Sequence, residues 1–141
     1  MIFSKSERPF GIQIFGNDPT TISEAAIILY ENYKPNIIDI NMGCPVKKVF
    51  KKGAGAALLK DIEKAYKICY KTAKNAPASV TVKARIGWDY KNIIAEEFIK
   101  AITSCVHEVT DVDFPKGKIA LRQLQNEDCN VQKSNLFLST F

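Results

Sequence analysis

Three short apolar segments, each followed by a helix pattern, constrain the fold of this chain most strongly. The segments span residues 10–15, 37–41 and 79–85, and a glycine follows each of them within two residues. Asp18 and Pro19 form the start signal of the first helix. Strands that alternate with helices of this length form parallel βα units with right-handed crossovers. The sequence therefore predicts either a doubly wound sheet or part of a (β/α)8 barrel.

Polar residues alternate with apolar residues along the predicted strands, so one face of the sheet collects polar groups. These residues are Gln13, Asp39, Asn41, Thr81, Lys83 and Arg85. A closed core tolerates such groups only when they are paired or bound to a ligand. Two explanations remain open at this point. One is a barrel interior that faces a bound cofactor, and the other is internal pairing, such as an ion pair between Asp39 and Lys83.

A cysteine turn, INMGCPV, follows the second predicted strand at residues 40–46. Gly43 allows the backbone to approach a ligand closely, and Pro45 stiffens the turn. Cys44 therefore lies at the carboxyl end of a strand, where ligands bind in both architectures. A small buried thiol without chemical function fits the same pattern equally well.

Positive charge is concentrated in the first part of the chain. Residues 1–105 carry 16 Lys and Arg against 10 Asp and Glu, whereas residues 106–141 carry 4 against 5. Four lysines, at positions 47, 48, 51 and 52, follow the cysteine turn. A basic surface suits a polyanion such as nucleic acid, although a merely solvated surface gives the same composition. Gly53 and Gly55 lack the spacing of a nucleotide-binding motif, so we predict turn residues there.

The four cysteines lie far apart, at positions 44, 69, 105 and 129, and the chain has one histidine. This usage argues against a zinc site and favours free thiols in a reducing cytoplasm. No apolar run is long enough to cross a membrane, and the first residues do not resemble a signal peptide. We therefore expect a cytoplasmic protein without a metal.

Three segments together resemble the tRNA-dihydrouridine synthase family. Residues 11–19 (GIQIFGNDP) are similar to its QIFG-DP signature, and residues 80–88 (VTVKARIGW) resemble its VKxRxGW strand. Its central motif resembles DINMGCPV at residues 39–46 with KGAGAALL at residues 52–59. The segments occur in the family's order within residues 8–103. The resemblance implies an FMN-dependent (β/α)8 barrel, of which this chain would hold three consecutive βα units and an irregular C-terminal tail.

The resemblance also implies an activity, which is the reduction of specific uridines in tRNA to 5,6-dihydrouridine. NADPH would be the reductant, FMN would pass hydride to C6 of the uracil, and Cys44 would protonate C5 as a general acid. Gln13 and Lys83 would contact FMN by the same resemblance. Asn41 would help to hold both the flavin and the uracil.

Further contacts are expected with the RNA, because the target nucleotide must leave its stack to reach the flavin. Lys47 and Lys48 are candidates for phosphate contacts, with a solvated loop as the alternative. Arg85 is a candidate for the flavin, its phosphate or the RNA, and a structural ion pair remains open. Trp88 and Asp89 are expected to close the third strand and to cap the next helix.

The resemblance ends near Cys105. We expect residues 1–105 to form a partial FMN-binding barrel domain and residues 106–141 to form a divergent tail. His107 lies only nine positions after Phe98, which we expect to be too few for a helix, a turn and another strand. A closed barrel needs about 200–250 residues, so we expect open sheet edges, self-association through them and impaired activity.

Two other functions remain open from the sequence. A flavin barrel that acts on free pyrimidines has the same fold, but the lysines after the cysteine turn argue against it. A catalytically dead, basic α/β fragment that binds RNA is consistent with the charge of residues 1–105.

Overall fold

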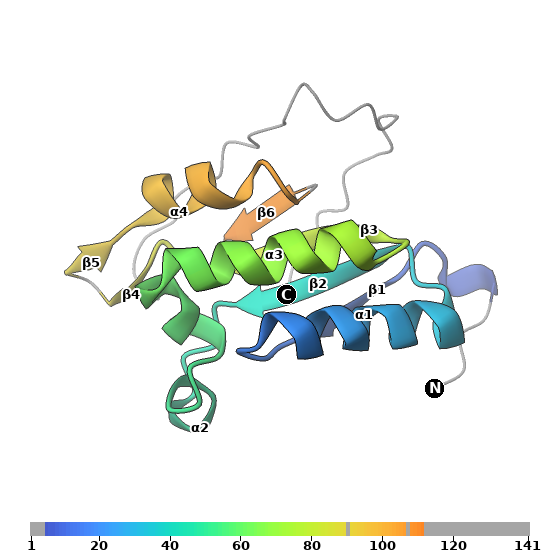
Figure 1. Ribbon diagram of the computed structural model, residues 1–141, viewed down its shortest axis with the longest axis horizontal. Coiled ribbons are helices and arrows are strands. Elements are labelled where there is room, and N and C mark those ends of the chain that lie inside the picture. Colours follow the sequence, from blue (N-terminus) through green and yellow to red (C-terminus); the bar gives the residue numbers. More distant parts are fainter. Residues whose placement is uncertain (1–4, 90, 107, 112–141) are drawn as a thin grey trace.

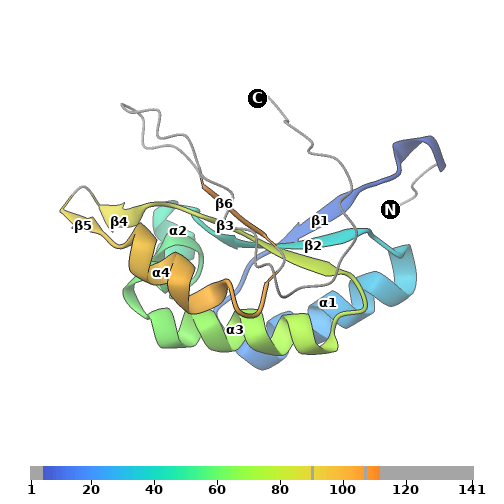
Figure 2. The same cartoon turned by 90° about the horizontal axis from the view of Figure 1, so that it is seen from above.

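The computed structural model describes residues 5–89, 91–106 and 108–111. Helices α1 (Pro19–Tyr33), α3 (Ile62–Asn75) and α4 (Ala95–Ile102) lie on one face of a four-stranded sheet (Figures 1 and 2). The sheet strands are β1 (Gly11–Ile14), β2 (Ile37–Met42), β3 (Ser79–Ala84) and β6 (Glu108–Asp111). The smaller elements are η1 (Lys5–Glu7), α2 (Lys47–Phe50), η2 (Gly55–Lys60), β4 (Gly87–Asp89) and β5 (Asn92–Ile93).

The three predicted βα units are confirmed. The sheet order is β1-β2-β3-β6, and every neighbouring pair is parallel. In such a sheet a one-residue slip would exchange the two faces of a strand. The observed register pairs Gln13 with Asp39, Asp39 with Thr81, and Asn41 with Lys83. The polar residues predicted to share a face are therefore neighbours across three strands.

The core lies between the sheet and its helices. Ile38, Ile40, Val80 and Val82 alternate with the polar residues and are fully buried. Helix α3 faces them with buried residues at helical spacing: Ala65, Ile68, Cys69 and Thr72. Burial of these apolar side chains holds α3 against the sheet and leaves the opposite, polar face without cover from α1, α3 or α4 (Figure 2).

The predicted start of α1 is confirmed in atomic detail. The Asp18 carboxylate accepts hydrogen bonds from the backbone N–H of Thr21 at 2.8 Å and from its hydroxyl at 2.8 Å. These bonds favour the charged form, so they lower the pKa of Asp18. The first helical position is Pro19, as expected where the missing N–H costs nothing.

The expectation that no further strand fits after the third helix is wrong. Helix α4 begins at Ala95 and ends after only eight residues at Ile102. A short turn then suffices to start β6 at Glu108, parallel to β3. His107 and residues 112–141 of the predicted tail lie outside the described residues.

Two local predictions also need correction. Residues 42–55 are expected from the sequence to form one long loop, but they contain the short helix α2, and η2 begins at the last of them. Asp89 does not cap α4; it accepts from the N–H of Lys91 at 2.8 Å and of Asn92 at 3.0 Å, which shapes the β4–β5 hairpin. The Asn92 side chain also donates to this carboxylate, and its bond is the main cause that lowers the pKa of Asp89. None of the described helices is both long and apolar enough to cross a membrane.

Candidate active site

A chain of side-chain hydrogen bonds crosses the polar face of the sheet. Asp39 accepts from the Thr81 hydroxyl at 2.7 Å and from the Gln13 amide nitrogen at 2.6 Å. The Gln13 oxygen then accepts from the Asn41 amide nitrogen at 2.9 Å. Because a carboxylate can only accept, Asp39 fixes which end of the Gln13 amide faces Asn41. The sequence pattern predicted that these residues share a face, and the structure adds which group donates and which accepts in each hydrogen bond.

Asn41 connects this network to the cysteine turn. Its side-chain oxygen accepts from the backbone N–H of Gly43 at 3.1 Å and of Cys44 at 2.9 Å. An Asn side chain that bonds backbone groups two and three residues later stabilises a tight turn. The carboxyl end of β2 is thereby held in one conformation, with the Cys44 thiol on a half-buried residue.

The segment that contains Gly55 packs against the other side of Cys44. The Ala56 N–H donates to the Cys44 carbonyl oxygen at 3.0 Å. Gly55 has a φ of +61°, and a Cβ built on it would lie 2.7 Å from that oxygen. Gly53 also has a positive φ, of +73°, and lies in a turn as predicted, whereas Gly55 is the first residue of η2. Gly55 is therefore required both for its backbone conformation and for its close approach to Cys44.

We expect Gly55→Ala to lower the free energy of unfolding more than Gly53→Ala does. Both changes force a side chain into the left-handed region, which costs about 1–2 kcal/mol. At Gly53 the nearest atom to an added Cβ is 3.8 Å away, so no further cost arises. Gly55→Ala must also displace the Cys44 turn. Urea unfolding of both variants measures the difference, and equal losses would show that Cys44 is not packed as described.

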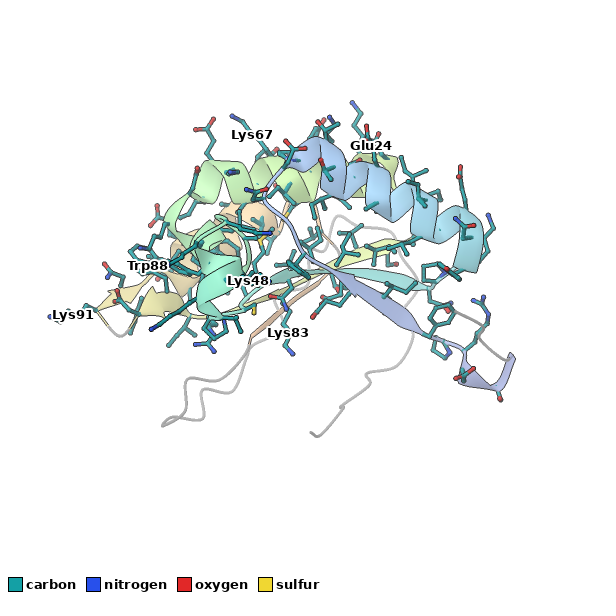
Figure 3. The ribbon with its side chains drawn as sticks, turned by 90° about the horizontal axis from the view of Figure 1, so that it is seen from below. Glu24, Lys48, Lys67, Lys83, Trp88 and Lys91 are labelled. Carbon is teal, nitrogen blue, oxygen red and sulfur yellow. The ribbon has the colours of Figure 1, made fainter. Side chains whose placement is uncertain are left out.

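Lys83 lies beside Asn41 in the register and is exposed on the polar face. Figure 3 shows its side chain pointing away from the helices. The alternative of an Asp39–Lys83 ion pair is wrong, because within the described residues Asp39 bonds Gln13 and Thr81 instead. The ammonium group is therefore directed to the space beyond the sheet.

The remaining predicted site residues lie around the same carboxyl ends of the strands. The aliphatic part of Arg85 lies next to Gly43, since a Cβ on that glycine would be 3.5 Å from the Arg85 Cγ. Lys47 and Lys48 are exposed residues of α2, immediately after the cysteine turn. Asp39 and Thr81 support the site through their hydrogen bonds, a role that was not predicted from the sequence. Their alternation with apolar residues did indicate that both lie on the polar face.

A cavity of about 290 Å³ adjoins the cysteine turn. Its lining residues are Pro45, Lys47, Phe50, Lys51, Ala56 and Trp88. Sequence reasoning did not group Phe50 with Trp88, because they lie on different elements and no short motif contains both. At the carboxyl ends of β2 and β3, the polar face of the sheet therefore lies next to this largely apolar cavity.

Comparison with known proteins agrees with the family resemblance of the three sequence segments. The family model described as "Dihydrouridine synthase (Dus)" matches residues 1–109. A probable tRNA-dihydrouridine synthase of Treponema pallidum is 36% identical over 103 residues, which are 70% of this chain and 30% of that protein. The tRNA-dihydrouridine synthase B of Pasteurella multocida is 45% identical over 94 residues, 67% of this chain and 28% of that protein.

The tRNA-dihydrouridine synthase B of Vibrio cholerae is 49% identical over 83 residues, which are 57% of this chain and 25% of that protein. The chain therefore spans less than a third of the length of these curated relatives. The matched residues include the polar face, the cysteine turn and all of the described strands except the end of β6. The family model matches most of the length of this chain, which shows that the chain belongs to the dihydrouridine synthase family.

Proposed function

We propose that this chain carries the flavin-facing and uridine-facing part of a tRNA-dihydrouridine synthase. The observation that supports this most is the hydrogen-bond chain from Gln13 through Asn41 to the backbone of Cys44. The hydrogen-bond chain links two amides to the cysteine turn, and Asn41 pairs with Lys83 in the strand register. In a (β/α)8 barrel, which we propose as the complete architecture, this polar face would line the interior at the catalytic end.

The residues of the polar face fit FMN chemically. Each of the Gln13 and Asn41 amide nitrogens uses one proton in the hydrogen-bond network of the polar face and keeps another for a ligand. Lys83 has an exposed ammonium group that can compensate negative charge on a flavin ring. When bound, FMN supplies the hydride that reduces the uracil ring, and NADPH is the proposed source of its electrons.

Cys44 is the proposed proton donor. Its Sγ would hold the proton that C5 of the uracil receives, while the turn keeps the residue in place through Asn41. The role needs a thiol that gives up its proton in the reaction, rather than a nucleophile. Asn41, which is adjacent in the sheet to Lys83, would orient the uracil through its remaining amide proton.

The proposed substrate is tRNA. The α2 lysines Lys47 and Lys48 lie next to the cysteine turn, where phosphates flanking the target uridine would pass. Arg85 is the proposed RNA contact at the end of β3. Such contacts depend on salt and carry no sequence information, so the choice of uridine would come from the fold of the tRNA.

Substitution of Lys83 tests the flavin site. We expect Lys83→Gln to weaken FMN binding about tenfold, because a charge-assisted hydrogen bond is lost. The fold should be unchanged, since the Lys83 side chain forms no hydrogen bond or ion pair with another described residue. Titration of the protein with FMN, followed by flavin fluorescence, gives the two dissociation constants.

Lys91→Gln is the matched control, because Lys91 is an exposed lysine of the β4–β5 connection (Figure 3). Equal affinity of the wild type and Lys83→Gln would reject the Lys83 contact. A wild-type chain that binds tRNA but no FMN would favour the alternative function, a basic α/β fragment that binds RNA without catalysis.

A further inference from the structure

The cavity beside the cysteine turn has aromatic residues from two separate elements. Phe50 is the last residue of α2, and Trp88 lies in β4, after the third strand of the sheet. Both side chains are half-buried and pack against the core, so their positions are restrained. Two aromatic side chains on the wall of one small cavity offer flat apolar surface to a planar ligand.

Positive charge surrounds these rings. The Lys60 ammonium lies 5.0 Å from the centre of the Phe50 ring and 5.7 Å from the centre of the Trp88 ring. Lys47 and Lys51 contribute to the lining of the cavity itself. All three lysines are exposed, and none forms an ion pair with a described residue. The cavity thus combines an apolar floor with a cationic rim, which suits a planar ring that carries a phosphate.

The cavity lies directly beside the proposed proton donor but apart from the proposed flavin site. Pro45, the residue after Cys44, lines it, and so does Ala56, whose N–H donates to the Cys44 carbonyl at 3.0 Å. Lys83, in contrast, points from the sheet to the side away from the helices (Figure 3). A strand that places one nucleotide at Cys44 would therefore bring its neighbour to the aromatic cavity.

We propose that this cavity binds a second, unstacked base of the RNA substrate, adjacent to the target uridine. Phe50 and Trp88 would stack on the base, and Lys47, Lys51 and Lys60 would contact its flanking phosphates. Its volume of about 290 Å³ is near the lower end for small-molecule sites, so it accepts one ring system rather than two. This inference rests on the proposed RNA substrate, but it does not depend on catalysis.

Trp88 is the sole tryptophan of the chain, so tryptophan fluorescence reports on this cavity alone and makes the test direct. The full chain, without FMN, is titrated with a short oligouridylate and with the abasic oligonucleotide of equal length and charge. We expect saturable quenching by the oligouridylate and at least about tenfold weaker binding of the abasic probe, because stacking contributes most of the affinity. Equal quenching by both probes, or none by either, would overturn the proposal.

Two variants separate the cavity from a general charge effect. Phe50→Leu keeps an apolar side chain against the core but removes the stacking surface, so oligouridylate binding should weaken about tenfold. Tyr70→Leu is the control, because Tyr70 is 47% exposed on α3 and does not line the cavity. Equal affinities of Phe50→Leu and Tyr70→Leu would contradict the stacking role.

FMN titration with the same readout distinguishes this inference from the proposed function. If FMN quenches Trp88 and competes with oligouridylate, and Phe50→Leu abolishes both effects, the cavity is a flavin site and the base-binding proposal is wrong. If oligouridylate binds as expected but Lys83→Gln leaves FMN affinity unchanged, the base site stands and the proposed flavin site fails. The two proposals therefore fail on different measurements.

Discussion

Replacement of Cys44 by alanine is expected to abolish dihydrouridine formation and to leave FMN binding unchanged. The Sγ atom is the proposed source of the proton for C5, and loss of a general acid typically costs about a hundredfold or more in rate. The substitution keeps the backbone N–H that donates to Asn41 at 2.9 Å, so the turn and the proposed flavin contacts remain. Product is measured after incubation with FMN, NADPH and tRNA that lacks dihydrouridine.

Cys105→Ala provides the matched control for this experiment. Cys105 is also half-buried, but it follows α4, and its thiol donates to the Ile102 carbonyl at 3.1 Å, far along the chain from the turn. Its rate should equal that of the wild type. Undiminished product from Cys44→Ala would reject the proton-donor role. Absence of product from the wild type would show that the residues of this chain are not sufficient for the reaction by themselves.

The polar face was predictable from the sequence because its physical cause is local. Side chains on a strand alternate between faces, so Asp39 and Asn41 had to share one face, as Thr81 and Lys83 did. Parallel pairing then had to align these strands to keep Ile38, Ile40 and their neighbours buried. What the pattern left open was the choice of partner. The register pairs Lys83 with Asn41, which leaves Asp39 to Gln13 and Thr81.

The sequence did not predict three features of the structure, and each has its own physical cause. Asp89 resembles a helix cap, yet the Asn92 side chain and two nearby N–H groups bind its carboxylate in the hairpin first. Strand β6 was missed because α4 is short and ends at Ile102, which leaves room for a turn before Glu108. The cavity lined by Phe50 and Trp88 was not predicted, because the two residues come together only through the path of the chain between them. The periodicity of residues does not give that path.

Replacement of Asn41 by alanine is expected to destabilise the folded chain by about 2–3 kcal/mol. The change removes the acceptor of two backbone N–H groups, at Gly43 and Cys44, and the donor to Gln13. Each such bond contributes about 0.5–1.5 kcal/mol, and the partly buried N–H groups of Gly43 and Cys44 lose their acceptor. Urea unfolding measures the loss. Asn32→Ala, which removes one exposed bond to the Ile28 carbonyl, should change stability by less than about 1 kcal/mol.

Asn41→Asp separates the two functions of this side chain. A carboxylate can still accept from the N–H groups of Gly43 and Cys44, but it cannot donate to the Gln13 oxygen. The cysteine turn should therefore remain ordered while the Gln13 amide loses its fixed orientation. We expect a stability between those of the wild type and Asn41→Ala, together with weaker FMN binding. If Asn41→Ala destabilises no more than Asn32→Ala does, the cysteine turn does not depend on the polar network, and the proposed active site loses its structural support.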